Sequence, residues 1–266
     1  MNETQNLHDA EPLLYEERDG IAVITLHRPH ALNAIDVAVL QGLMQLLGRA
    51  EKADTARALI LTGTGPAFSA GADIKYLRSA SPLQVRAFAR LAVQVTRRLE
   101  TFAKPVVAAL NGVSFGGGLE LAEACMIRVA ASHARLGHPE VRIGAVAGFG
   151  GTTRLPRLVG KGRAAEMLLR GRAVDAEEAL RIGLVQAIAA PERLMAETEA
   201  VVRDILAQSP TAVRLTWEAL HRGLNMTLEE SAELGADYFG LVAASEDFRI
   251  GTTAFVEKGK PVWTGQ

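Results

Sequence analysis

The stretch Asn111-Gly112-Val113-Ser114-Phe115-Gly116-Gly117-Gly118-Leu119-Glu120 decides the expected fold. An apolar, strand-like run at residues 105–110 leads into it, and a helix-like run at residues 119–125 leaves it. Three consecutive glycines allow positive φ angles and let another group approach the main chain closely. The N–H groups that begin the following helix point back at that space, with the positive end of the helix dipole behind them. The stretch can therefore hold an oxyanion beside Glu120, although an ordinary strand-to-helix turn has the same pattern.

The composition narrows the class of protein. The chain has 266 residues, of which 48% are hydrophobic and 22% charged, which fits one large globular domain or one domain with an appendage. The balance of 29 basic against 30 acidic residues gives no electrostatic footprint for nucleic acid or an anionic membrane. No run approaches the length of a membrane span, and residues 1–11 carry no visible targeting signal. We expect a cytoplasmic protein with a buried, unreactive thiol at Cys125, the single cysteine.

Strand and helix patterns divide the chain in two. Asp19-Gly20 is a hairpin turn signal between two apolar runs. Strands are predicted at 13–18, 21–27, 57–63, 105–110, 126–131 and 185–188, and helices between them at 35–52, 82–101, 152–158, 163–170 and 175–182. Beyond Pro191 only helices are predicted, at 192–207, 210–221, 227–244 and 247–257. We therefore expect an α/β part over residues 12–190 and an all-helical part over residues 191–266.

Several familiar motifs are missing from the sequence. No Gly-x-Gly-x-x-Gly follows a strand, so a dinucleotide-binding fold has no fingerprint. Gly160-Lys161-Gly162 lacks the Ser/Thr and the upstream glycine of a P-loop. The six histidines show no metal-ligand spacing, so we expect no metal site.

One pattern resembles the nucleophile elbow of a hydrolase. Gly112-Val113-Ser114-Phe115-Gly116 fits Gly-x-Ser-x-Gly between a strand and a helix. Ser114 would then need a downstream acid and histidine, for which Asp175 and His221 are candidates. No His-Gly-Gly oxyanion loop lies upstream, and the chain beyond Pro191 lacks strands to carry the triad. In a glycine-rich loop the pattern arises easily by chance.

Three separated stretches carry the groups that a site would need. They are Ala70-Gly71-Ala72-Asp73-Ile74-Lys75, Gly116-Gly117-Gly118-Leu119-Glu120 and His138-Pro139-Glu140. With these motifs the chain resembles the enoyl-CoA hydratase/isomerase (crotonase) superfamily from about Leu14 to Lys258. The resemblance rests on eight motifs in the family's order, at residues 27–34, 68–74, 104–112, 116–122, 139–140, 148–152, 155–160 and 254–258.

The resemblance implies a fold and a substrate. The fold is the α/β crotonase spiral of ββα units, closed by a helical C-terminal region that packs subunits into homotrimers or, as pairs of trimers, homohexamers. The substrate is an acyl-CoA of fatty-acid metabolism, so coenzyme A arrives with the substrate and no separate cofactor is expected. Hydration of a 2-enoyl-CoA to a 3-hydroxyacyl-CoA is the implied reaction.

The resemblance also implies catalytic roles. The backbone N–H groups of Ala72 and Gly117 would form an oxyanion hole for the thioester carbonyl. Hydratases of this family hold a water between two glutamates, and Glu120 and Glu140 occupy both matching positions. Because two nearby carboxylates disfavour simultaneous ionisation, one can stay protonated while the other is a base. We assign Glu120 as the base that orients water and Glu140 as the proton donor to Cα.

Further residues resemble those that hold the rest of the substrate. The loops at 28–34 and 68–72 would line the path of adenine and pantetheine. Phe255 and Lys258 would reach the 3′-phosphate ribose of CoA, often from a neighbouring subunit. The candidates for substrate and CoA binding are Arg28, Ala31, Leu32, Ser69, Ala70, Asp73, Ile74, Lys75, Gly148, Phe255 and Lys258.

Alternatives stay open within and outside the family. Isomerisation, a specialised dehydration or a decarboxylation of a CoA thioester would use the same enolate chemistry, and a non-catalytic binding member is possible. Gly148 stands where dienoyl isomerases would carry a further acid, which argues against that reaction. Two positions depart from the family pattern, Glu123 and Met126. Glu123 is either a surface charge or a neighbour that raises the pKa of Glu120.

Overall fold

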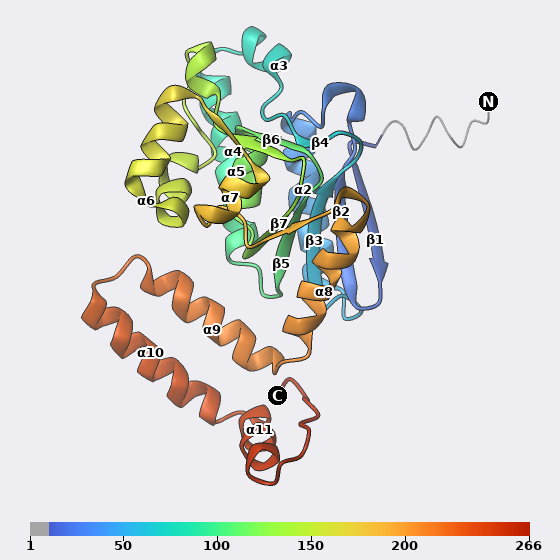
Figure 1. Cartoon of the computed structure of the whole chain (residues 1–266), viewed down its shortest axis with the longest axis vertical. Helices are drawn as coiled ribbons and strands as arrows, with labels where there is room; N and C mark the ends of the chain where they lie inside the picture. The colour runs from blue at the N-terminus through green and yellow to red at the C-terminus, as the bar shows by residue number, and fades with distance from the viewer. Residues whose placement is uncertain (1–10) are drawn as a thin grey trace, which may run out of the picture. The chain divides into compact units, whose positions relative to one another are not determined.

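The computed structural model describes residues 11–266 (Figure 1). The chain folds into two compact units. The first unit runs to Phe102 and resumes from Val106 to Glu199, and the second comprises Ala103–Pro105 and Ala200–Gln266. The first unit contains both sheets, and the second contains helices only.

A six-stranded sheet forms the centre of the first unit, in the order β1-β2-β3-β5-β7-β10. Strands β1 and β2 pair antiparallel through the predicted hairpin, whose Asp19 and Gly20 have φ angles of 50° and 79°. Positive φ at both positions is what a two-residue type I′ turn requires. The remaining strands pair in parallel. Their bounds are β1 Leu13–Arg18, β2 Ile21–Leu26, β3 Ala58–Gly63, β5 Val106–Leu110, β7 Ile127–Ala131 and β10 Ala187–Ala189.

A second sheet of four short strands was not predicted from the sequence. It has the order β4-β6-β8-β9, with β4 Ala67–Ser69, β6 Val113–Phe115, β8 Arg135–Gly137 and β9 Ala173–Asp175. The chain visits the two sheets alternately, because β3 is followed by β4, β5 by β6 and β7 by β8. With a helix after each pair of strands, this path is the expected spiral of ββα units.

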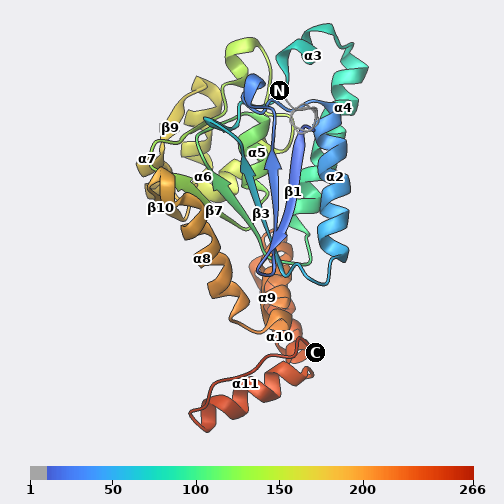
Figure 2. The same ribbon diagram turned by 90° about the vertical axis from the view of Figure 1, so that its right-hand side faces the viewer.

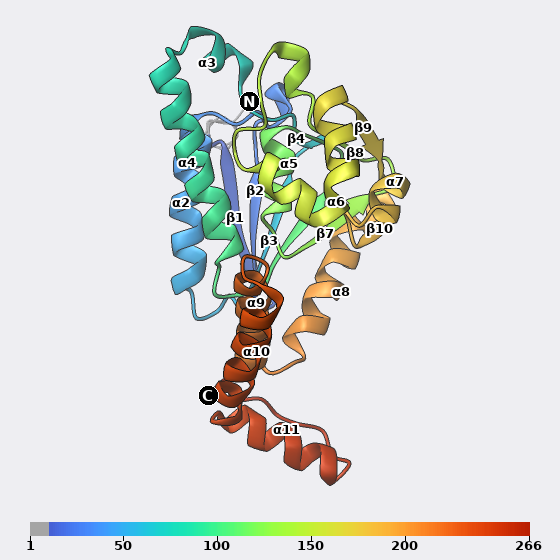
Figure 3. The same ribbon diagram turned by 90° about the vertical axis from the view of Figure 1, so that its left-hand side faces the viewer.

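Two long helices, α2 (Val37–Lys52) and α4 (Pro82–Glu100), lie side by side along the larger sheet, as Figures 2 and 3 show from opposite sides. Ser81 caps α4 in a capping box with Gln84, and Pro82 occupies the first helical position, as predicted. Helix α2 begins later than expected, because Ile35 forms a β-bridge with Ala72 instead.

Shorter helices complete the first unit. Helix α6 contains a break at Gly160, whose φ and ψ angles of 78° and 156° separate the two helices expected there. The bounds are η1 Pro29–Ala31, α3 Ile74–Ser79, α5 Gly117–Glu123, η2 Glu140–Ile143, α6 Gly151–Arg170, α7 Ala176–Arg181, η3 Pro191–Arg193 and α8 Leu194–Leu206, the last of which continues into the second unit.

The second unit carries α9 (Pro210–Gly223), α10 (Leu228–Ala243) and α11 (Glu246–Val256). No strand occurs between residues 191 and 266, as the sequence predicts. Buried Asp247 at the start of α11 ties the chain end to this unit, because it accepts hydrogen bonds from Ser209, Thr264 and Gly265. Within residues 11–266 no helix combines the length and apolar character that crossing a membrane would need.

Candidate active site

The smaller sheet brings the three sequence motifs together. Strand β6 lies between β4 and β8 and pairs in parallel with both. The carboxyl ends of these strands lead directly into Ala70-Gly71-Ala72, Gly116-Gly117-Gly118 and His138-Pro139-Glu140. Because the carboxyl ends of neighbouring parallel strands meet at one edge, ligands bind there in many α/β proteins. Three stretches that are far apart in the sequence therefore lie together at one edge of the sheet.

The two glycine loops touch through their backbones. Gly71 and Gly116 have φ angles of 100° and 50°. A Cβ atom on Gly71 would lie 2.9 Å from the carbonyl oxygen of Phe115 and 3.4 Å from the nitrogen of Gly117. Among residues 11–266 no acceptor takes a hydrogen bond from the N–H of Ala72 or of Gly117. Two loops that touch thus each present a backbone N–H group that has no acceptor among the described residues.

Glu120 lies in the first turn of α5 and is buried. Its Oε1 accepts hydrogen bonds from the backbone N–H groups of Phe149 at 2.8 Å and Gly151 at 2.6 Å. Burial raises the pKa of the Glu120 carboxyl to about 7, and the charges of Glu123 and Glu140 act in the same direction, against the hydrogen bond from Gly151. Glu120 can therefore exchange a proton near neutral pH.

Glu140 begins η2 and faces the second glycine loop. A Cβ atom on Gly116 would lie 3.0 Å from Oε1 of Glu140, so a glycine at this position leaves room for the carboxyl group. Its other oxygen, Oε2, is buried and has no hydrogen-bond partner among the described residues. A buried carboxyl oxygen without a partner is costly, which is typical of a group that awaits a substrate or water.

Glu123 is a buried residue and not a surface charge, so the first of its two sequence interpretations is wrong. Its Oε1 lies 2.8 Å from Nε2 of His138, whose side chain is completely buried. Nδ1 of His138 lies 3.5 Å from Oε1 of Glu140. Burial alone would lower the pKa of His138, but Glu123 and Glu140 raise it to about 10. The charge of Glu123 also contributes to the raised pKa of Glu120, as the second interpretation expects.

Three predicted binding residues hold the loops of the first unit. Arg28 donates to the carbonyl of Ala34 and forms ion pairs of 3.2 Å with Asp36 and Asp73. Asp73 also caps α3, and the ion pair helps to lower its pKa although burial opposes the shift. Ser69 is buried and donates to the carbonyl of Asn33. These side chains fix the shape of the loop that carries Ala72.

The other predicted residues of this unit lie around the loops. The side chains of Leu32 and Ile74 are exposed although apolar, and Lys75 is exposed at the start of α3. Ala31 and Ala70 are partly buried, and Gly148 is exposed in the loop before α6. Contact of these residues with CoA stays a prediction.

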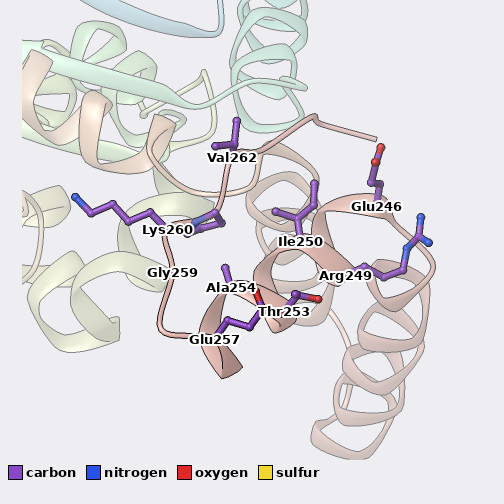
Figure 4. Close-up of a pocket in the computed structure, with 10 residues that line it drawn as sticks. Glu246, Arg249, Ile250, Thr253, Ala254, Glu257, Gly259, Lys260 and Val262 are labelled. Atoms are coloured by element: carbon purple, nitrogen blue, oxygen red, sulfur yellow. The ribbon is translucent and has the colours of Figure 1, made fainter.

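Phe255 and Lys258 belong to the second unit, where both are exposed. This unit has its own groove between α11 and the chain that follows it (Figure 4). Charged side chains of both signs line the groove, including Arg249, Glu257 and Lys260. None of the predicted site residues lines it. The role of Phe255 and Lys258 in CoA binding stays a prediction.

Sequence reasoning missed two contributors to the site. The backbone N–H of Phe149 donates to Glu120, and its ring fills the space where Gly117 has no side chain, since a Cβ there would lie 2.4 Å from Cε2 of Phe149. Asn33 is buried and binds the carbonyls of Thr64 and Ala67, joining two loops. Backbone donors leave no sequence signal, whereas an asparagine in an apolar setting does.

The hydrolase alternative does not fit the structure. Ser114 is buried within β6, and its Oγ donates to the carbonyl of Gly112 at 3.2 Å. Asp175 caps α7, while His221 lies in α9 of the second unit. The Gly-x-Ser-x-Gly pattern is therefore a strand and loop and not a nucleophile elbow. Cys125 is buried, as expected, and burial raises its pKa to about 12.

Known proteins resemble this chain over nearly its full length. The enoyl-CoA hydratase/isomerase family model matches residues 16–266. A crotonyl-CoA hydratase from Syntrophomonas wolfei is 40% identical over 251 residues, which cover 94% of this chain and 96% of that protein. A short-chain-enoyl-CoA hydratase from Clostridium acetobutylicum is 40% identical over 249 residues, covering 93% and 95% respectively.

Solved structures agree with these relatives. The crystal structure of an enoyl-CoA hydratase from Bacillus anthracis superposes with a TM-score of 0.91 at 34% identity and covers 96% of this chain and 100% of that one. A structure from Geobacillus kaustophilus, described as an enoyl-CoA hydratase subunit, gives a TM-score of 0.91 at 35% identity, with 96% and 98% covered.

Proposed function

The chain belongs to the enoyl-CoA hydratase/isomerase family, and we propose that it is an enoyl-CoA hydratase, which adds water to a 2-enoyl-CoA to give a 3-hydroxyacyl-CoA. One observation carries this proposal: the carboxyl groups of Glu120 and Glu140 interact beside two backbone N–H groups that have no acceptor within residues 11–266. A pair of proton-transfer groups beside an oxyanion-binding pair is what hydration of a conjugated thioester needs.

The backbone donors would stabilise the enolate. When water attacks C3 of the enoyl group, the electron pair of the double bond moves toward the thioester carbonyl, whose oxygen gains negative charge. The N–H groups of Ala72 and Gly117 would hold that oxygen. Since both donors are fixed by the backbone, they need no reorganisation as the charge develops. Removal of one such donor typically costs about 3 kcal/mol of transition-state stabilisation.

The two glutamates would divide the proton transfers. Glu120, whose pKa burial raises to about 7, takes a proton from the water as its oxygen bonds to C3. Glu140 then gives a proton to C2, which restores the thioester carbonyl. One proton leaves the water and one arrives on carbon, so the sum of the two transfers is the addition of one water molecule. Both carboxyls on one side of the substrate would give syn addition.

We propose that the substrates have short acyl chains. The ring of Phe149 packs edge-on against Phe88 with centroids 5.3 Å apart, and Phe88 contacts Tyr76 at 5.2 Å. This row of rings begins beside Gly117 and so fills space next to the proposed thioester site. The two relatives described above, named for crotonyl and short-chain substrates, support the same choice.

The proposal extends to the assembly and the location of the protein. We expect a homotrimer or homohexamer in the cytoplasm, with CoA supplied by the substrate. Large apolar side chains on α10 and α11 are exposed, among them Phe239, Leu241 and Phe255, and subunit contacts would bury such residues. Light scattering on the purified protein measures the assembly.

The direct test is the loss of conjugated-thioester absorbance when the enzyme meets crotonyl-CoA. We expect hydration of crotonyl-CoA, with lower kcat/KM as the enoyl chain lengthens. Glu120→Gln and Glu140→Gln should each lose most of the activity. Full activity in either variant would contradict the mechanism, and no reaction with any short or long enoyl-CoA would contradict the function.

A further inference from the structure

The proposed reaction uses Glu120 and Glu140, but two further titratable groups are buried beside them. Glu123 and His138 form an ion pair in which both side chains have no exposed surface. Burying an ion pair costs desolvation energy, and a neutral polar or apolar pair often serves stability as well. The charges of this pair therefore call for an explanation beyond packing.

The two contacts of the His138 ring indicate where its protons lie. At 2.8 Å from Oε1 of Glu123, Nε2 carries a proton and donates it to that carboxylate. Nδ1 faces Oε1 of Glu140 at 3.5 Å, and a second proton there makes the ring an imidazolium that donates toward both glutamates. Glu123, through its charge and its hydrogen bond, holds this form against the effect of burial on the ring.

His138 thereby orients the Glu140 carboxyl group through one of its two oxygens. Oε1 faces His138, while Oε2 is buried without a partner among the described residues. Oε2 is the oxygen left to carry the proton that moves to C2. After the transfer Glu140 is a carboxylate, and the imidazolium that faces its Oε1 stabilises the new negative charge.

We propose that Glu123 and His138 are positioning residues for Glu140: Glu123 holds His138 as an imidazolium, and His138 orients the Glu140 carboxyl and stabilises the charge that appears on it when its proton moves to C2. The pair stands one step behind the reacting atoms, as the aspartate of a serine protease stands behind its histidine. This inference rests on the proposed hydratase function.

Other charged groups also act on Glu123 and His138. Glu120 interacts with both His138 and Glu123, and the buried guanidinium of Arg128 lies near Glu123. Arg128 donates to the carbonyls of Leu184 and Cys125, so its hydrogen bonds serve the backbone. The cation that faces Glu140 is therefore His138 and not Arg128.

The test removes both charges and keeps a hydrogen-bonding pair. In the double variant Glu123→Gln/His138→Gln two amides can bond to each other, so neither side chain is left as a buried, unpaired charge. His133→Gln is the matched control, because His133 is an exposed histidine in the loop before β8. Circular dichroism and thermal unfolding establish that each variant folds.

We expect the double variant to hydrate crotonyl-CoA with kcat lowered about tenfold or more. Because the double variant lacks the cation that faces Glu140, the alkaline limb of the pH profile of kcat/KM should move up by about one pH unit. The control should match the wild type in both. A folded double variant with the wild-type pH profile overturns the proposal, whether kcat falls or not.

A second measurement is independent of turnover. In the ligand-free enzyme with ¹⁵N-labelled histidine, the ring signals of His138 should show an imidazolium at pH 8, and in Glu123→Gln they should show a neutral ring. A neutral His138 in the wild type overturns the proposal. If the wild type hydrates no enoyl-CoA while His138 is an imidazolium, the proposed function fails and the charge state stands.

Discussion

Glu120 in the first unit and Asp247 in the second are both carboxyl groups buried from solvent, and they behave in opposite ways. Asp247 accepts hydrogen bonds from Ser209, Thr264 and Gly265 through both of its oxygens. Burial opposes ionisation there too, but these donors outweigh it and lower the pKa of Asp247. Glu120 has two donors on one oxygen and carboxylates as neighbours, and its pKa rises to about 7.

The difference separates a structural acid from a reactive one. A buried carboxylate with enough donors stays ionised and holds chain segments together, as Asp247 holds the C-terminal segment to α9 and α11. A buried carboxyl with fewer donors and like charges nearby can gain or lose its proton at neutral pH. Burial alone does not tell the two apart, whereas the inventory of partners does.

The largest expected effect is on activity. Glu120→Gln and Glu140→Gln should each lower kcat for crotonyl-CoA about 10²- to 10⁴-fold, because an amide cannot accept or give the proton. Asp247→Asn should leave the rate per folded enzyme near that of the wild type. Steady-state kinetics on all three variants checks this contrast. A comparable loss of kcat in Asp247→Asn would contradict the distinction between a reactive and a structural acid.

The next effect is on stability and concerns Asp247. Asp247→Asn should lower the free energy of unfolding by about 1 to 2 kcal/mol, since charge-assisted hydrogen bonds become neutral ones. The pKa of Asp247 is lowered from 3.8, so its contribution is present above that pH and is lost as the pH falls through the folded-state value. Thermal unfolding at pH 7 and pH 3 measures the difference, which should shrink at pH 3. An equal difference at both pH values would mean that the ionised form of Asp247 is not what the donors stabilise.

A glycine substitution probes the space around Glu120. A Cβ on Gly151 would lie 2.9 Å from Cε1 of His138 and 3.0 Å from Oε1 of Glu120, so Gly151→Ala should displace one of them. A shift of about 1 Å at a catalytic group costs up to about a hundredfold in rate, and we expect at least tenfold. Gly235→Ala in α10 is the control, because nothing lies within 4 Å of its Cβ position. Equal kcat in the two variants would show that the site tolerates displacement of Glu120.

Part of this structure could be predicted from the sequence. The helical C-terminal region was predicted from the helix patterns beyond Pro191, while the resemblance to the enoyl-CoA hydratase/isomerase superfamily implied the spiral fold and the pairing of Glu120 with Glu140. The fold is confirmed by the structure and by the relatives. The three-residue strands of the smaller sheet were missed because β4, β6 and β8 are too short to show alternation.

The partners of the carboxylates could not be predicted. Glu123 looks like a helix surface charge until the fold brings His138, fifteen residues later, to within 2.8 Å. The donors to Glu120 are backbone N–H groups of Phe149 and Gly151. Nearly every residue type has a backbone N–H group, so the sequence does not indicate which one donates. Such contacts depend on tertiary structure and not on local sequence.

The smallest expected effect is a gain in thermal stability in the variant Glu120→Gln, which loses activity. Glu120→Gln should raise the melting temperature at pH 8 by about 2 to 4 °C, because it removes a carboxylate whose ionisation the fold disfavours. The pKa of Glu120 is raised from 4.5 to about 7, so the wild type is penalised increasingly as the pH rises through this range and not below it. Scans at pH 4.5 and pH 8 should show the gain only at pH 8. A gain of the same size at both would assign it to packing.

Titration of the carboxyl groups by ¹³C NMR, with labelled glutamate and aspartate, tests the central claim most directly. The predicted result is one glutamate signal that titrates near pH 7 and disappears in Glu120→Gln, while the Asp247 signal titrates below 3.8. A wild-type protein in which every glutamate titrates below pH 5 would contradict the account.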